Sequence, residues 1–65
     1  MAYDITEFKH GDRVMIRVIG RAFGLVLSEH PHTIFEKEDG HLYYNNVKDH
    51  RLDSVSQKNE IVKIK

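Results

Sequence analysis

Hydrophobic and polar residues alternate in short runs along this chain, which is the period of a β-strand rather than that of a helix. The clearest run is residues 14–18, directly after a polar turn that contains Gly11 and Asp12. Its apolar side is formed by Val14, Ile16 and Val18. Because long or charged side chains alternate with these three, we predict a strand that buries one face.

A second apolar run, residues 23–27, has hydrophobic side chains on both faces, which favours a central or strongly curved strand. Gly24 within it predicts a β-bulge or a close crossing of two backbones. We expect residues 28–32 to form a loop, because Pro31 donates no hydrogen bond and restricts the residue before it. A third strand is expected at residues 33–37.

The sharpest turn signal in the chain is Asp39-Gly40. These residue types suit the positive φ angles of a tight hairpin, so we predict one that leads into a fourth strand at residues 41–45. In that strand Tyr43 and Tyr44 would point to opposite faces, so at least one of them would point away from the core.

The remaining segments are short and more polar. Residues 46–50 are typical of a single helical turn capped by Asn46. Residues 51–55 alternate again, and a final strand is expected at residues 60–65. The core predicted from all segments comprises Val14, Ile16, Val18, Leu25 or Val26, Ile34 or Phe35, Leu42, Tyr44, Leu52 and Val62. The two alternatives stay open because a slip of one residue exchanges the faces of a strand.

The length of the chain, 65 residues, suits one domain, which we place at residues 1–65 with residues 1–7 as a loose N-terminal arm. The chain has no cysteine, so disulfides and thiolate zinc sites are excluded. The N-terminus lacks the basic and apolar regions of a signal peptide, and no apolar run approaches the roughly 20 residues of a membrane span. We therefore expect a cytoplasmic protein that does not contact membranes.

Charge and motifs exclude several functions. Ten Lys and Arg residues balance ten Asp and Glu residues, which argues against strong nonspecific attraction to nucleic acid. His30-Pro31-His32 places two imidazoles close together, but no further motif fixes a metal geometry. No serine lies in a nucleophile elbow, and no glycine-rich stretch has the spacing of a phosphate loop. We predict no catalytic residue, no metal site, no cofactor and no small-molecule substrate.

Aromatic and cationic residues give the best candidate site. An outward-facing Tyr43 beside His41 and Asn45 would form a flat stacking surface with hydrogen-bonding neighbours. Cations near the first loop would contact phosphates or carboxylates. The predicted binding residues are therefore Arg17, Arg21, His41, Tyr43 and Asn45.

A structural alternative remains for the aromatic residues. In it, Tyr44 and Phe35 fill the interior, while Tyr43 covers an edge with its hydroxyl in water. Aromatic rings contribute most of the buried area that a small core needs, so this alternative is retained beside the binding site.

The order of these features resembles an SH3-like small β-barrel over residues 8–55. The matching features are the opening Gly11-Asp12-Arg13-Val14, a loop at residues 19–22, the turn Asp39-Gly40 and a helical turn at residues 47–50. The chain is similar to stand-alone barrels of the KOW type and to small prophage-encoded barrel proteins. The resemblance implies an all-β fold, a small SH3-like barrel of five to six short antiparallel strands with one helical turn before the last barrel strand.

The resemblance also implies a non-enzymatic binding or adaptor module, for which two partner classes remain. The neutral net charge favours a protein or peptide partner. The similarity to KOW-type barrels favours a nucleic-acid-associated module, in which Arg13, Arg17 and Arg21 act together with a tyrosine.

Overall fold

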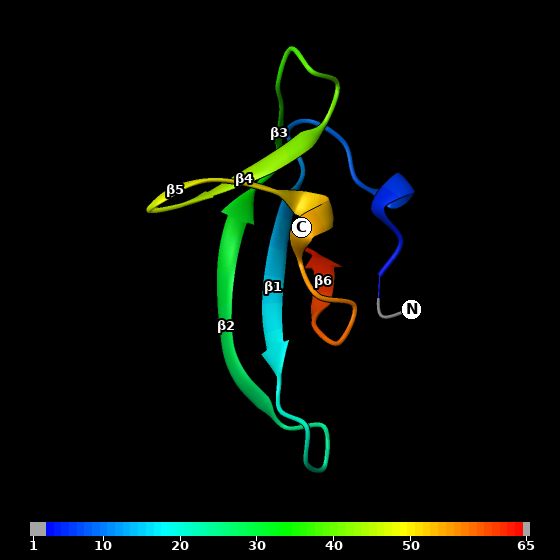
Figure 1. Cartoon of the computed structure of the whole chain (residues 1–65), viewed down its shortest axis with the longest axis vertical. Helices are drawn as coiled ribbons and strands as arrows, with labels where there is room; N and C mark the ends of the chain where they lie inside the picture. Colours follow the sequence, from blue (N-terminus) through cyan, green and yellow to red (C-terminus); the bar gives the residue numbers. More distant parts are fainter. Residues whose placement is uncertain (1–2, 65) are drawn as a thin grey trace.

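Two antiparallel sheets of three strands each form the protein, whose computed structural model describes residues 3–64 (Figure 1). The first sheet has the order β2-β1-β6, with β1 at Arg13–Ile19, β2 at Val26–Thr33 and β6 at Glu60–Lys63. The second has the order β3-β4-β5, with β3 at Phe35–Glu36, β4 at Leu42–Asn46 and β5 at Lys48–Arg51. Two 3-10 turns, η1 at Ile5–Glu7 and η2 at Leu52–Ser54, precede β1 and β6. The described chain is therefore all-β, as predicted, and its two sheets are open.

Strand β1 is the centre of the first sheet, and its predicted alternation is confirmed. Val14 is fully buried and Ile16 nearly so, whereas Arg13 on the other face is exposed. The strand pairs with β2 on one side and with β6 on the other, so its backbone is hydrogen-bonded along both edges.

The core is enclosed by the two sheets and the N-terminal segment, which contributes Tyr3 and Phe8. Its buried side chains are Tyr3, Phe8, Val14, Ile16, Ile34, Leu52, Val55 and Ile61, with Ile5, Leu42 and Tyr44 packed against them. The structure therefore confirms four core predictions as buried, namely Val14, Ile16, Ile34 and Leu52. It also decides the alternative at Ile34 or Phe35 in favour of Ile34.

The core predictions at Val18, at Leu25 or Val26 and at Val62 were wrong, for two reasons. Val62 lies opposite Met15 on the outer side of the first sheet, so its neighbour Ile61, opposite Ile16, is buried instead. Val18 is on the inner face, but the pairing of β1 with β6 extends only as far as Arg17, and the second sheet covers only the other end of β1 (Figure 1). Leu25 and Val26 lie beyond that same limit and are exposed.

The second strand begins later than predicted and continues through the expected loop. Strand β2 starts at Val26 and includes Pro31, which pairs with Met15. An edge strand tolerates proline because only one side of its backbone is hydrogen-bonded. Phe23 and Gly24 form a turn with φ angles of 64° and 63°. The space that a Cβ would occupy at Gly24 is open, with nothing packed within 4 Å, so no backbone crosses there. A β-bulge does occur in this hairpin, but at Leu27, where the register shifts between the pairs Val18–Ser28 and Ile19–Val26.

Residues 46–50 form part of a hairpin rather than the predicted helical turn: Asn46 ends β4, Val47 is the turn, and β5 begins at Lys48. Strand β5 pairs with β4, and the side chains reinforce the pairing: the Asn45 amide donates to Asp49 Oδ1 at 2.9 Å, and Tyr44 stacks on His50. These cross-strand contacts outweigh the local helical signal, even though Val47 must adopt a φ of 68°. The helical turn occurs one element later, as η2, where an alternating strand was expected.

The described part of the N-terminal segment is attached to the core instead of forming a loose arm. Tyr3 is buried, and its hydroxyl donates a hydrogen bond to the carbonyl of Val55. Asp4 caps η1 by accepting a hydrogen bond from the Thr6 N–H at 3.0 Å, and Phe8 is buried. Residues 1 and 2 lie outside the described range, as does Lys65 of the expected last strand.

The predicted Asp39-Gly40 hairpin joins β3 to β4, and it yields a stability test. Gly40 has a φ of 82°, and the space around a Cβ there is open. We expect Gly40→Val to lower the free energy of unfolding by about 1–2 kcal/mol through backbone strain alone. Gly40→Asn, which tolerates this conformation, should lose less. Urea midpoints measure both effects, and equal midpoints for wild type and Gly40→Val would contradict the turn.

At the β4–β5 hairpin, a substitution at Val47 should have the opposite effect on the free energy of unfolding. Its side chain is fully exposed, while its φ of 68° is unfavourable for a β-branched residue. Val47→Gly should raise the free energy of unfolding by up to about 1 kcal/mol, because relief of strain exceeds the added entropy of the unfolded chain. Val62→Gly, in the regularly paired strand β6, should be destabilising. Thermal melts of the two variants compare these signs, and destabilisation by Val47→Gly would refute the strained turn.

Candidate binding surface

The outer side of the second sheet carries an aromatic and charged surface. Along β4, Leu42 and Tyr44 pack against the core, so Tyr43 and Asn45 point to the other face. Pairing with β3 and β5 brings further residues onto that face. We define the outer patch as Phe35, Lys37, Asp39, His41, Tyr43, Asn45, Asp49 and Arg51.

A stacked aromatic pair forms the centre of the outer patch. The rings of Phe35 and Tyr43 have centroids 6.0 Å apart and planes inclined by 25°. Lys37 Nζ lies 4.4 Å from the centroid of the Tyr43 ring, in a cation–π arrangement. Both rings are half-buried by their neighbours, although they lie on the side of the sheet away from the core.

The hydroxyl of Tyr43 is fixed by Asp39. It donates a hydrogen bond to Asp39 Oδ2, and the His41 N–H donates to Asp39 Oδ1 at 2.9 Å. These two bonds, the tyrosine bond first, hold the pKa of the Asp39 carboxyl below its ordinary value. The carboxylate in turn raises the pKa of Tyr43. The aromatic pair is therefore oriented before any partner arrives.

Ionic contacts surround this pair with both signs of charge. Asp49 accepts from the Asn45 amide at 2.9 Å and lies 2.9 Å from Lys37 Nζ, and both contacts lower the pKa of its carboxyl. Arg51 Nη2 lies 2.6 Å from Asp53 Oδ2 and 3.2 Å from His41 Nδ1. The Arg51 guanidinium lowers the pKa of Asp53. Anions therefore alternate with cations across the patch.

Tyr44 packs against the core from the inner face of β4, as the structural alternative for the aromatic residues expected, whereas Phe35 does not fill the interior. The ring centroid of Tyr44 lies 5.0 Å from that of His32 and 5.3 Å from that of His50. Burial raises the pKa of Tyr44. Tyr43 differs from that alternative, because its hydroxyl bonds to Asp39 and its ring stacks on Phe35, which lies outside the core.

The structure brings together only part of the predicted site. His41, Tyr43 and Asn45 share the outer patch, but Arg17 lies in β1, where its Nε is 2.9 Å from Glu29 Oε2. Arg21 lies in the loop between β1 and β2. Sequence reasoning missed Lys37, Asp49 and Arg51, because only the register of β3, β4 and β5 places them beside Tyr43.

An acidic hollow lies at the β3–β4 hairpin, next to the outer patch. It measures about 430 Å³ and is open to solvent, and its lining residues are Glu36, Lys37, Glu38 and Asp39. Three carboxylates against one ammonium group give it a negative potential, which repels phosphate groups. This end of the molecule is therefore unfavourable for a nucleic-acid backbone.

Within residues 3–64, no three His, Asp or Glu side chains are grouped so that they could hold a metal ion. In the same range no helix is long and apolar enough to cross a membrane. No family model, curated protein or solved structure matches the chain. The outer patch, a stacked aromatic pair surrounded by polar and charged side chains, is suited to noncovalent recognition.

The Asp39–Tyr43 bond predicts how the protein responds to pH. The lowered carboxyl pKa contributes stability above the ordinary aspartate value of 3.8, and this stability is lost as the pH falls through the lower folded value. Asp39→Asn should make the loss of stability in acid shallower and return the pKa of Tyr43 toward 10.0. Urea unfolding at several acidic pH values and ultraviolet titration of the tyrosines measure the two effects. An unchanged acid slope and an unchanged tyrosine titration would contradict the bond.

Proposed function

We propose that the protein is a non-enzymatic binding module of SH3-like architecture that recognises a protein or peptide through the outer patch. The observation that carries this proposal is the position of the Phe35–Tyr43 pair, which is stacked on the outside of a sheet and fixed there by hydrogen bonds and ionic contacts. An aromatic anchor surrounded by polar groups is the usual arrangement of an energetic hot spot in protein interfaces.

Three features of the chain support the SH3-like class. Gly11-Asp12 opens the first strand, the Asp39-Gly40 hairpin joins two strands of the second sheet, and a 3-10 turn precedes the final strand. In addition, the final strand β6 pairs with the first strand β1. The hairpin at Val47 departs from the expected pattern, since it replaces the helical turn at that position.

The distribution of charge favours a protein partner over a nucleic acid. A phosphate backbone needs several unpaired cations in a row. On the outer patch, Lys37 is paired with Asp49 and Arg51 with Asp53, and the adjacent hollow is acidic. A protein surface of mixed charge can pair with such a patch, because it can present acids and bases in the matching order.

Preorganisation lowers the cost of binding at this patch. Tyr43 has few rotatable bonds, and its ring and hydroxyl are already in contact with Phe35, Lys37 and Asp39. Little side-chain entropy is therefore lost when a partner covers the ring. Exposed His41 and Asn45 are available at the rim as hydrogen-bonding groups for specificity.

The role of Tyr43 is tested by capturing proteins from a lysate with the immobilised chain. Tyr43→Ala should abolish capture of specific partners, with a loss of about 2 kcal/mol for a hot-spot residue. Tyr43→Phe should retain most of the affinity, since it keeps the stacked ring. Val62→Ala, an exposed apolar change in the first sheet, serves as the control. Unchanged capture by Tyr43→Ala would refute the outer patch.

Direct titration with RNA, single-stranded DNA and duplex DNA at increasing salt tests the competing class of partner. We expect weak binding that does not depend on Arg17. Tight binding whose salt slope flattens by about one unit in Arg17→Ala or Arg21→Ala would contradict a protein-binding module and support a nucleic-acid-binding one.

A further inference from the structure

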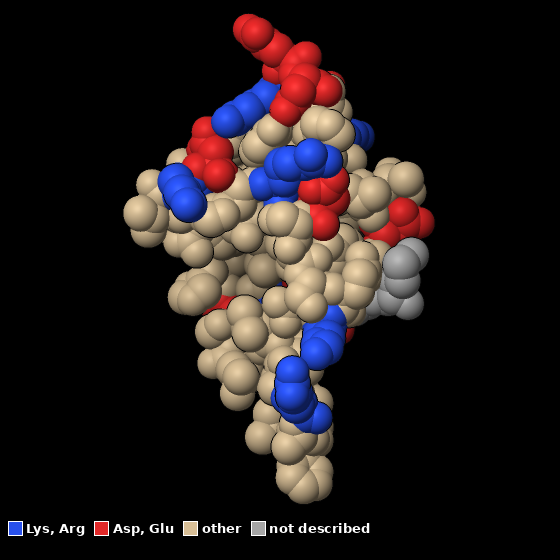
Figure 2. All heavy atoms as spheres, viewed as in Figure 1, with Lys and Arg blue, Asp and Glu red and all other residues tan. Residues whose placement is uncertain are grey.

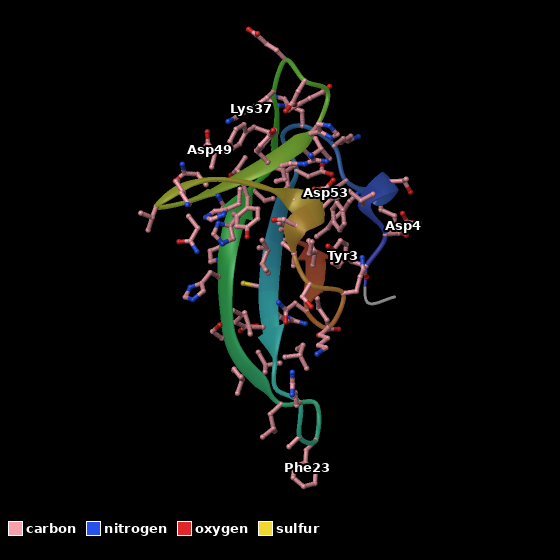
Figure 3. All side chains as sticks on the ribbon, in the orientation of Figure 1. Tyr3, Asp4, Phe23, Lys37, Asp49 and Asp53 are labelled. Carbon is pink, nitrogen blue, oxygen red and sulfur yellow. The ribbon has the colours of Figure 1, made fainter. Side chains whose placement is uncertain are left out.

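The hairpin between β1 and β2 exposes an unusual number of large apolar side chains. We define the hairpin tip as residues 18–27. Its exposed hydrophobic residues are Val18 at 38%, Phe23 at 96%, Leu25 at 60%, Val26 at 49% and Leu27 at 68% of their full accessibility. Phe23 projects from the extreme end of the molecule (Figure 3). Apolar surface gathered at one place on a small protein marks an interaction site.

The hairpin tip is an ordered structure. The Gly20 N–H donates to the carbonyl of Leu25 at 2.7 Å and closes the loop. The side chain of Leu27 packs over Gly20, with Cδ2 only 3.3 Å from where a Cβ would be. The tip is therefore held in one shape by contacts of its own.

The backbone conformation at Phe23 indicates that this residue does not serve to stabilise the fold. Phe23 and Gly24 both have positive φ, the arrangement of a tight hairpin turn in which Asn-Gly is the favoured pair. Phe23 accepts this strain while making no contribution to the core, and, unlike Val47, it lies among other exposed apolar side chains. This combination points to a role in binding.

Charge is segregated along the long axis, which measures 39 Å against 23 and 22 Å for the other two. Arg21 is the one charged residue between Val18 and Ser28, and among residues 3–64 it has no ion-pair partner. Lys58 is likewise unpaired within that range, and its neighbour Asn59 accepts a hydrogen bond from the Ile19 N–H at 3.2 Å.

At the opposite end, acids and bases are mixed, and acids predominate at the β3–β4 hairpin. Glu36, Glu38 and Asp39 are exposed at the β3–β4 hairpin, whereas Glu29, in β2, is neutralised by Arg17. Figure 2 shows red and blue side chains together in the upper part of the molecule, with red at its extreme end, and blue ones above the tan lower end. An anionic surface would therefore attract the apolar end and repel the other, which orients the molecule.

We propose that the hairpin tip inserts into the interface of an anionic lipid surface. Phe23 and Leu25 enter the boundary between headgroups and acyl chains, while Arg21 and Lys58 remain at the level of the lipid phosphates. Contact with a membrane was not expected from the sequence. It is independent of the proposed function, because the outer patch belongs to the other sheet and stays free for a protein.

A lipid surface fits the tip better than a groove on a protein. The exposed side chains of the tip lie on both faces of the hairpin. Val18 is on the inner face, whereas Val26 pairs with Ile19, the residue after Val18, and so points to the outer face. A partner must therefore surround the tip to cover both faces. A lipid interface does so without a matching shape, and the flanking cations supply the preference for anionic headgroups.

Tryptophan fluorescence tests the insertion directly, because the chain contains no tryptophan. In Phe23→Trp, emission should shift to the blue when vesicles of phosphatidylglycerol and phosphatidylcholine are added, and much less with phosphatidylcholine alone. Val47→Trp is the matched control, since Val47 is also fully exposed, apolar and at positive φ, but on the other hairpin. Its emission should not shift. Arg21→Glu in the Phe23→Trp background should weaken the response.

Co-sedimentation with the same vesicles gives a second measurement on the unlabelled protein. Phe23→Asn suits the turn, so this variant should fold, yet its partition onto anionic vesicles should fall about tenfold or more. Retained partition by Phe23→Asn would overturn the proposal. So would an equal shift of tryptophan at positions 23 and 47, or no shift at position 23 with any vesicle.

Two other binding partners of the hairpin tip, a second copy of the chain and a different protein, are distinguished by measurements that do not depend on vesicles. A blue shift of Phe23→Trp that grows with protein concentration would assign the tip to a second copy of the chain. A shift caused by a purified protein partner, with vesicles inactive, would assign it to a protein pocket. Either result would overturn the lipid proposal while leaving the tests of the outer patch unaffected.

Discussion

The arrangement of the two sheets depends on Ile34, the single residue that lies between β2 and β3. Its side chain is fully buried, its N–H donates to the carbonyl of Asp12 at 2.8 Å, and its carbonyl accepts from the Gly11 N–H at 2.8 Å. The backbone there is paired with the segment that opens β1, although it belongs to neither sheet. Burial of one side chain and two backbone bonds thus join the sheets where the chain passes from one to the other.

Both candidate surfaces follow from the way the chain passes from one sheet to the other at Ile34. Because Ile34 points inward, its neighbour Phe35 points outward and can stack on Tyr43. Because the second sheet covers only one end of β1, the far end of the β1–β2 hairpin has nothing packed on it and exposes Phe23 (Figures 1 and 3). One constraint therefore separates an aromatic surface with alternating charges from an apolar tip flanked by cations. A module that is oriented at one end and recognises a protein at the other is consistent with this separation.

Local patterns predicted the features that depend on local physics. The alternation around Val14 and Ile16, the positive φ at Gly40 and the opposite faces of Tyr43 and Tyr44 were all available from the sequence. Features set by distant pairing were not. Pro31 is tolerated because β2 is an edge strand, and Ile61 replaces Val62 in the core because of the β1–β6 register. Neither fact has a local signal.

The candidate site likewise contains residues that a local pattern indicated and residues that only strand pairing brings together. His41, Tyr43 and Asn45 were found because they lie in one strand, where the two-residue period places side chains. Lys37 and Arg51 were not anticipated beside Tyr43, and Arg17 lies in the other sheet, because these relations depend on which strands pair. Amide hydrogen exchange at Ile34 tests the underlying account most directly. The Ile34 and Gly11 amides should exchange as slowly as those of β1, as expected when they open only on global unfolding. Fast exchange at Ile34 while β1 stays protected would show that the backbone bonds at Ile34 do not join the two sheets.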